Sequence, residues 1–333
     1  MSVAGFAVVA FMLTAYVILD GYDLGAAVVS PLVARTERER SAVIATIGPF
    51  WNGNEVWLIA AGGALFALFP RAYASAFSGF YLPFIVVLWL LILRGIALEL
   101  RDHFPSPLWR GFWDVTFTAS SALLIAIFGV ALGNLIRGVP LDEKGYFQGT
   151  FAFLLNPYAL LVGVLAMATL AMHGANFVAM RTEGGIYERA LRAASTLWWF
   201  VAGLWIAMTV ATFAVRGGVP PEAPWLYVLP GFSLAALALA RVAAVRRHPR
   251  TAFAASAAFI GSLLVTAAAT MYPYLLPGFP AGRSAGGISV VSAAPSPVAM
   301  ATALTATILG ICIVVAYSLL VARRMRGKVS VED

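Results

Sequence analysis

The chain has 333 residues, of which 61% are hydrophobic and only 11% are charged, and its mean hydropathy is +0.88. This composition excludes an ordinary water-soluble domain, in which about a quarter of the residues are charged. The formal net charge of +7 does not indicate a nucleic-acid partner, because the basic residues are spread along the chain and form no patch.

Apolar windows follow one another along the chain. Most of them are close in length to the ~20 residues that a helix needs to cross a bilayer. They predict an all-α polytopic membrane protein with about nine transmembrane helices. The first window has no basic flank or cleavage site and continues past Asp20, so we expect a retained span and not a signal peptide. The windows are 3–30, 54–70, 76–98, 114–136, 157–180, 196–215, 224–241, 252–276 and 299–322.

The connections between the windows leave little room for a second domain. The longest, 137–156 and 277–298, are too short to fold alone, so we expect residues 1–333 to form one transmembrane domain. The segment 277–298 is rich in Gly, Ser and Pro and predicts flexible turns, not a packed unit.

Basic residues mark the ends of alternate windows. Most Lys and Arg residues lie at or after the ends of odd-numbered windows, and few follow even-numbered ones. Because Lys and Arg favour the cytoplasmic side, we expect the N-terminus outside and the C-terminus in the cytoplasm. The final basic group is then cytoplasmic and consists of Arg323, Arg324, Arg326 and Lys328.

Two carboxylates interrupt the first window in the run Asp20-Gly21-Tyr22-Asp23-Leu24-Gly25. On a helix, Asp20 and Asp23 share one face, because residues three apart are neighbours. Gly21 and Gly25 form a small-xxx-small strip that permits close contact with another helix.

Further polar residues occur where the second window begins, in the run Trp51-Asn52-Gly53-Asn54-Glu55, and Arg94 lies near the inner end of the third window. Antiparallel packing of the first three windows would gather Asp20, Asp23, Glu55 and Arg94 near the cytoplasmic boundary.

Two interpretations of this group remain open. Ionisable groups within spans usually face the bundle interior or a water-filled path, so the carboxylates could load and release protons. Alternatively, they are interfacial caps and a structural ion pair. Glu99, Arg101 and Asp102 lie farther toward the loop, and we expect them to be solvated surface charges.

Histidine and cysteine limit the cofactors. His103 and His248 fall in loops and only His173 lies within a window, so the chain is poorly equipped to hold several haems. His173 could be a hydrogen-bonded interior residue, part of a proton or quinone environment, or a ligand. Cys312 is the only cysteine and cannot build a metal site alone, and we predict no metal site.

Several motifs together resemble subunit II of cytochrome bd-type quinol oxidases. The block from Trp51 to Leu82 is long enough to be specific, and the matches extend over nearly the whole chain. The other motifs are Asp20-Gly-Tyr-Asp-Leu-Gly25, Leu93-Arg-Gly95, Met180-Arg-Thr-Glu-Gly184 and Tyr272-Pro-Tyr-Leu-Leu-Pro277.

The resemblance implies nine helices, arranged as two four-helix bundles plus one peripheral helix, in a bacterial inner membrane. It implies a heterodimer with a larger subunit I that binds haems b558, b595 and d, and small extra subunits occur in some members. The complex would oxidise quinol and reduce O2 to water with proton uptake from the cytoplasm. Some members also hold a structural quinone in this subunit. No nucleic acid is expected, and membrane lipid surrounds the chain.

The resemblance also implies roles for single residues. Asp20 would belong to a proton path, with Asp23, Glu55 and Asn52 near it. At Asn52 the family often has an aspartate, and an amide cannot exchange a proton as a carboxylate does. If the path needs a second acid here, Glu55 is the nearby candidate; otherwise protons travel by water or through the other subunit. The support residues are Trp51, Asn54, Arg94 and His173.

A proton-coupled secondary transporter is the alternative from another class. Transporters usually show paired broken helices near the membrane midplane, and the windows show no such pairing. The carboxylates also lie toward one surface.

Overall fold

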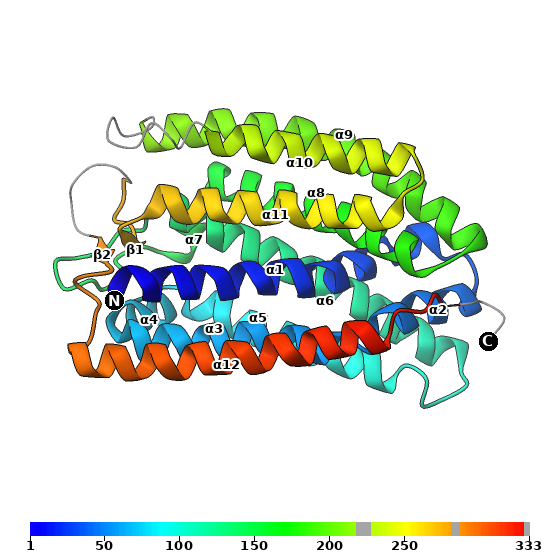
Figure 1. The fold of residues 1–333 in the computed structure, drawn as a ribbon, viewed down its shortest axis with the longest axis horizontal. Helices are drawn as coiled ribbons and strands as arrows, with labels where there is room; N and C mark the ends of the chain where they lie inside the picture. Colours follow the sequence, from blue (N-terminus) through cyan, green and yellow to red (C-terminus); the bar gives the residue numbers. More distant parts are fainter. Residues whose placement is uncertain (218–227, 281–286, 330–333) are drawn as a thin grey trace.

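The computed structural model describes residues 1–217, 228–280 and 287–329, and long helices run side by side along its longest axis (Figure 1). The start of the first helix and the end of the last one lie at opposite ends of this axis. The helices are α1 (Ser2–Val33), α2 (Glu37–Ile47), α3 (Trp51–Leu68), α4 (Pro70–Gly79), α5 (Tyr81–Leu100), α6 (Pro107–Arg137), α7 (Phe151–Leu154), α8 (Pro157–Arg181), α9 (Gly184–Arg216), α10 (Val228–Val245), α11 (Pro249–Met271) and α12 (Pro297–Arg324).

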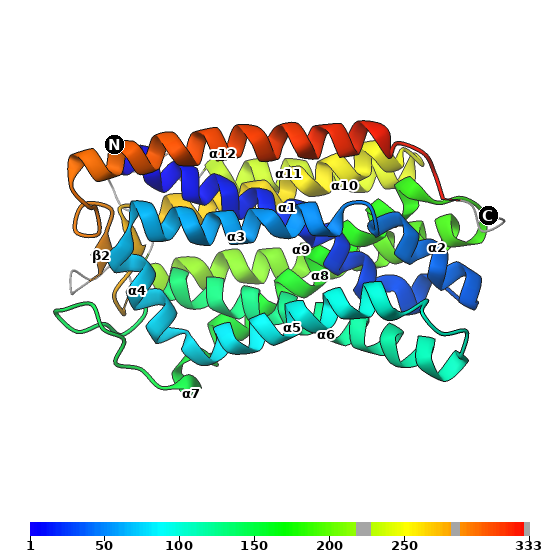
Figure 2. The ribbon, with the colours of Figure 1, turned by 90° about the horizontal axis from the view of Figure 1, so that it is seen from below.

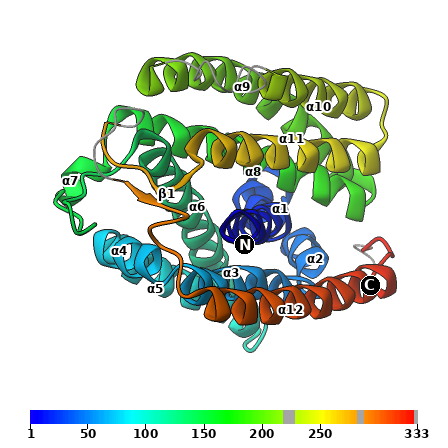
Figure 3. The same ribbon diagram turned by 60° about the vertical axis from the view of Figure 1, so that its left-hand side comes forward.

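The long helices form two groups. In the first, α1 packs on α3 and α6, and α5 packs on α6; in the second, α8 packs on α9 and α11, and α10 packs on α11. Helices α1 and α6 also pack on α8 and so join the groups. Helix α12 lies along α3 at the edge (Figures 2 and 3). This arrangement agrees with the expected helical bundles and peripheral helix.

Eight of the described helices are long and apolar enough to span a membrane, namely α1, α5, α6, α8, α9, α10, α11 and α12. The remaining expected span corresponds to α3, which is not among these eight and carries Asn52, Asn54 and Glu55 in its first two turns. The expected number of nine spans is therefore not established by hydropathy.

Several predicted boundaries were wrong. The window 76–98 contains two helices, because Pro83 lacks the N–H that would continue a helix from Gly79. Helices α6 and α9 begin well before the windows 114–136 and 196–215, because their first two turns carry charged residues that the apolar windows excluded: Arg110 in α6, and Glu188 and Arg189 in α9. The start of the window 224–241 lies outside the described residues.

The apolar windows also missed a short helix. Helix α2 is polar at its start and carries a capping box: the Thr36 hydroxyl accepts from the Glu39 N–H (3.2 Å), and the Glu39 carboxylate accepts from the Thr36 N–H (3.3 Å). It lies at the end of the bundle where α12 ends (Figure 1).

A small sheet closes the opposite end. Strand β1 (Tyr274–Leu276) pairs antiparallel with β2 (Ile288–Ser289). Window 252–276 therefore ends as a strand. The expectation of unpacked turns over 277–298 was wrong for its second half, because Ile288, Val290 and Ala293 are buried; residues 281–286 lie outside the described part.

A close crossing of α1 and α8 positions the carboxylates of α1. A Cβ at Gly25 would collide with the Leu170 carbonyl, and one at Gly174 would collide with the backbone of Gly25 and Ala26. Both glycines are therefore required for this approach; the small-residue strip predicted the close contact at Gly25, whereas Gly174 was not predicted.

Candidate functional site

The structure brings Asp20, Asp23, Glu55 and Arg94 together between α1, α3 and α5. The Arg94 guanidinium donates to both Asp20 oxygens, from Nη2 to Oδ1 (2.7 Å) and from Nη1 to Oδ2 (3.1 Å). Nη1 also donates to Glu55 Oε1 (2.9 Å), and Nη2 lies 3.9 Å from Asp23 Oδ2. We call these four residues the carboxylate cluster.

Asp23 takes its hydrogen bond from another side chain. Asn54 Nδ2 lies 2.7 Å from Asp23 Oδ2, 2.9 Å from the Tyr22 hydroxyl and 3.2 Å from the Leu19 carbonyl. Asp23 Oδ1 is buried and has no hydrogen-bond partner among the described residues. Asn54 thus joins α3 to α1 and holds one side of Asp23, while the other oxygen is free to accept a proton or a water.

Charge and burial set what the carboxylate cluster can do. Asp20, Asp23 and Arg94 are 0% exposed, whereas the Glu55 side chain is 20% exposed. Three carboxylates face one guanidinium, and unbalanced charge is costly to hold away from water. The arrangement therefore favours retention of one or more protons, with Glu55 as the member most open to water.

Trp51 and Asn52 lie outside this group. The Trp51 ring packs against Gly95, the residue after Arg94, and so supports its position. Asn52 is exposed on the outer face of α3 and makes no side-chain hydrogen bond within the described residues. The structure therefore places Asn52 apart from the carboxylates with which it was grouped.

Sequence reasoning missed two tyrosines beside the cluster. Tyr22 accepts from Asn54 and stacks on Phe177, with 4.1 Å between ring centroids. Tyr16 lies one turn before Asp20, is 2% exposed, and its hydroxyl is buried. Their helical spacing from Asp20 and Asp23 could have indicated both.

His173 is a packed interior residue. Its Nδ1 lies 2.7 Å from the Ser256 hydroxyl and its Nε2 lies 3.1 Å from the Ile18 carbonyl. Its ring stacks on Phe253 with 4.7 Å between centroids. Both ring nitrogens are thus engaged and one ring face is covered, so His173 does not fit the role of a haem ligand. Within the described residues, no three His, Cys, Asp or Glu side chains are grouped to hold a metal ion.

An apolar groove runs between α1, α3 and α12. It is lined by Met12, Trp57, Ala60, Thr307, Gly310, Ile311 and Val314. The Trp57 indole N–H is buried there without a hydrogen-bond partner in the described part of the chain. The groove could therefore hold a flat apolar molecule that carries an acceptor oxygen.

Beyond the cluster, a second ionic network joins α2 to the α5–α6 hairpin. Arg101 is 1% exposed and donates to Asp114 (2.6 Å) and Glu37 (2.6 Å). Burial opposes its charge, but the hydrogen bond and charges of these carboxylates raise the pKa of Arg101 above its ordinary value. The expectation of a solvated Arg101 was wrong, whereas Glu99 and Asp102 are exposed.

Comparison with known proteins places the chain in a family. The family model described as cytochrome bd terminal oxidase subunit II matches residues 1–325. The probable cytochrome oxidase subunit 2 of Haemophilus influenzae is 35% identical over 298 residues, which cover 80% of this chain and 79% of that protein. The cytochrome bd-I ubiquinol oxidase subunit 2 of Escherichia coli is 32% identical over 302 residues, or 81% and 80% of the two chains.

A solved structure shows the same fold. A chain of the bd oxidase from Geobacillus thermodenitrificans superimposes with a TM-score of 0.76 over 97% of each chain, at 18% identity. The sequence and fold agree, and this chain belongs to the cytochrome bd terminal oxidase subunit II family.

Proposed function

We propose that this chain, as one transmembrane domain, supports a larger subunit I in a terminal oxidase that oxidises quinol and reduces O2 to water. Its place is a bacterial inner membrane, with the N-terminus outside and the C-terminus in the cytoplasm. Family membership supports this role over the proton-coupled transporter. The haems b558, b595 and d belong to subunit I in this proposal, because His173 offers no free ring nitrogen to a haem.

The carboxylate cluster carries the proposal that this chain also delivers protons. Reduction of O2 to water consumes protons, which must cross low-dielectric protein. Glu55 is the partly exposed member and takes a proton from cytoplasmic water. Its Oε1 and Asp20 Oδ2 both accept from Arg94 Nη1, at 2.9 and 3.1 Å. The two carboxylates compete for the same guanidinium. When Glu55 is protonated it loses its negative charge, and Arg94 Nη1 then interacts more strongly with Asp20.

Asn52 has no part in this path. Its amide cannot exchange a proton as a carboxylate does, and it lies on the exposed face of α3. Asp23 serves as the inner reservoir, because its Oδ1 is buried without a hydrogen-bond partner in the described residues. Asn54 and Arg94 hold these acids in place.

A structural quinone on this chain stays a prediction from the resemblance. The apolar groove between α1, α3 and α12 supports it, since the Trp57 N–H could donate to a quinone carbonyl.

Co-purification tests the assignment. A tagged chain, expressed with its neighbouring genes, should bring down a haem-containing partner with quinol oxidase activity. Recovery without haem, together with intact oxidase activity in a deletion strain, would refute it.

A pair of matched variants tests the proton role. Asp20→Asn should lower oxygen-reduction turnover in the purified complex, whereas Asp102→Asn, at an exposed loop position, should leave it near normal. Haem content, measured in both, shows whether assembly was intact. Equal and near-normal turnover in both would assign Asp20 to structure alone.

A further inference from the structure

Arg241 is a partly buried cation outside the carboxylate cluster. It lies in the last two turns of α10, which ends at the same end of the bundle as α12 (Figure 1). Its Nη1 is buried and has no hydrogen-bond partner, and no carboxylate lies within 4.0 Å of it, among the described residues. An arginine within a span is normally paired with an acid or reaches a polar boundary. Because Arg241 has no acidic partner within the described ranges, an anionic ligand could pair with it.

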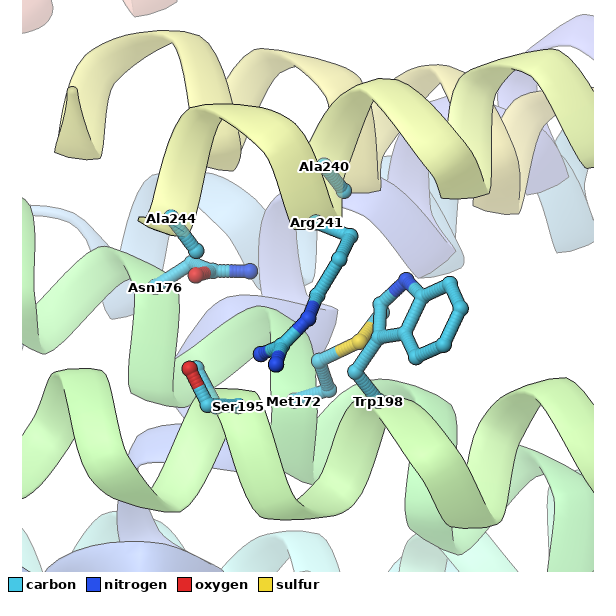
Figure 4. A pocket seen from close by; sticks show the side chains of 8 residues that line it. Met172, Asn176, Ser195, Trp198, Ala240, Arg241 and Ala244 are labelled. Atoms are coloured by element: carbon cyan, nitrogen blue, oxygen red, sulfur yellow. The ribbon is translucent and has the colours of Figure 1, made fainter. Parts of the chain in front are cut away.

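Arg241 lies at a small pocket between α8, α9 and α10, with an enclosed volume of about 10 Å³ and with two further polar side chains in its lining. Figure 4 shows its side chain reaching toward α9, with Asn176 and Ser195 on one side and Trp198 on the other. Asn176 is 2% exposed, and its Oδ1 also has no hydrogen-bond partner in the described part of the chain. A guanidinium, an amide and a hydroxyl therefore converge without pairing with one another.

Two tryptophans next to the guanidinium indicate that it lies at the depth of the membrane interface. It lies 5.8 Å from the Trp198 ring centroid and 5.7 Å from that of Trp199. The Trp198 N–H donates to the Leu237 carbonyl (2.8 Å), which fixes the ring. Trp199 is 65% exposed on the outer face of the bundle. Tryptophan is typical of the lipid–water interface, so the pocket lies where lipid headgroups are.

The charge around the pocket is positive. Arg192 lies three residues before Ser195 on α9, and Arg246 follows α10; both are exposed. The neighbouring Glu188 is already paired with Arg247 (2.7 Å). An anion arriving from the membrane surface therefore meets unpaired cations.

We propose that the opening of this pocket, at the partly exposed guanidinium of Arg241, binds the phosphate of an anionic phospholipid of the cytoplasmic leaflet. The phosphate accepts from the Arg241 guanidinium, the partly exposed Ser195 hydroxyl supplies a further donor, and the acyl chains lie along the exposed faces of α9 and α10. Basic pockets between transmembrane helices on the cytoplasmic side bind headgroups in this way. A quinone, which has no charge, would leave the guanidinium unpaired.

The test uses the delipidated oxidase complex in detergent and phosphatidylglycerol with a fluorescent label on its acyl chain. The complex should bind it saturably and prefer it to labelled phosphatidylcholine. Arg241→Gln should weaken binding about tenfold or more, as expected for loss of one charge-assisted hydrogen bond. Arg323→Gln, the same change of charge at the exposed end of α12, should leave binding unchanged.

Three results would overturn the proposal. The first is equal affinity for the two lipids in the unmodified complex, a measurement that does not depend on any variant folding. The second is full retention of binding in Arg241→Gln. The third is displacement of phosphatidylglycerol by millimolar inorganic phosphate, which would identify a site for free anions. If Arg241→Gln fails to assemble, Arg241→Lys replaces it and should keep the preference for phosphatidylglycerol at reduced affinity.

Discussion

Removal of Arg94 tests whether the carboxylate cluster is a buried, mutually dependent set of charges. Arg94 is 0% exposed and makes three hydrogen bonds to carboxylates, two with Asp20 and one with Glu55. Arg94→Gln leaves these acids without their cation. Breaking a buried ion pair by removing one partner costs about 3–5 kcal/mol.

A double variant shows whether Arg94→Gln destabilises the complex through an unpaired charge or through lost packing. In Asp20→Asn/Arg94→Gln the unpaired Asp20 carboxylate is gone, so the double variant should recover part of the lost stability. The coupling between two contacting residues is about 0.5–3 kcal/mol. Arg324→Gln, an exposed arginine at the end of α12, is the control for lost positive charge.

The assay is thermal unfolding of the purified complex, read as the midpoint of tryptophan fluorescence change. We expect the lowest midpoint for Arg94→Gln, an intermediate one for the double variant, and an unchanged one for Arg324→Gln. A double variant no more stable than Arg94→Gln would refute the reasoning, because the damage would then come from lost packing alone.

Two further predictions concern packing and pH. Gly25→Ala should destabilise the complex by about 1–3 kcal/mol, the usual effect of overpacking, because its methyl group meets the α8 backbone; Gly62→Ala, with open space around it, should be near neutral in the same thermal assay. Burial opposes the charge of Glu37, but its hydrogen bond with Arg40 and the charge of Arg101 lower its pKa below the ordinary 4.5. The Glu37 carboxylate therefore stabilises the fold fully at a pH above its ordinary pKa of 4.5. This stabilisation is lost as the pH falls through the lowered pKa. Acid unfolding of Glu37→Gln should show a weaker pH dependence, and an identical acid transition would contradict this.

The sequence predicted the approximate depth of the carboxylate cluster for a physical reason. Apolar windows fix the direction of each helix, and residues near the ends of antiparallel neighbours then lie at similar depth. This placed Asp20, Glu55 and Arg94 together. Side-chain direction is not fixed by depth, however, and Asn52 and Asn54, two residues apart on α3, face opposite environments.

The apolar windows missed the parts of the fold that are polar. Helix α2 depends on the Thr36–Glu39 capping box and on ionic contacts with the α5–α6 hairpin, none of which raises hydropathy. Arg101 was expected in water because charged loop residues usually are. Its burial depends on Asp114 and Glu37, which are distant in sequence. The pocket at Arg241 likewise depends on which helices become neighbours.

Proton uptake by the complex in vesicles is the most direct test of the central claim. Oxidase complexes carrying Glu55→Gln or Glu99→Gln would be oriented in vesicles, and proton uptake from the cytoplasmic side would be followed with a pH dye after an oxygen pulse. Glu55 contacts Arg94 and is the open member of the carboxylate cluster, whereas Glu99 is exposed on α5. We predict uptake slowed about tenfold or more in Glu55→Gln and unchanged in Glu99→Gln, with normal haem content in both. Uptake at the unmodified rate in Glu55→Gln would contradict the claim that protons enter through this chain.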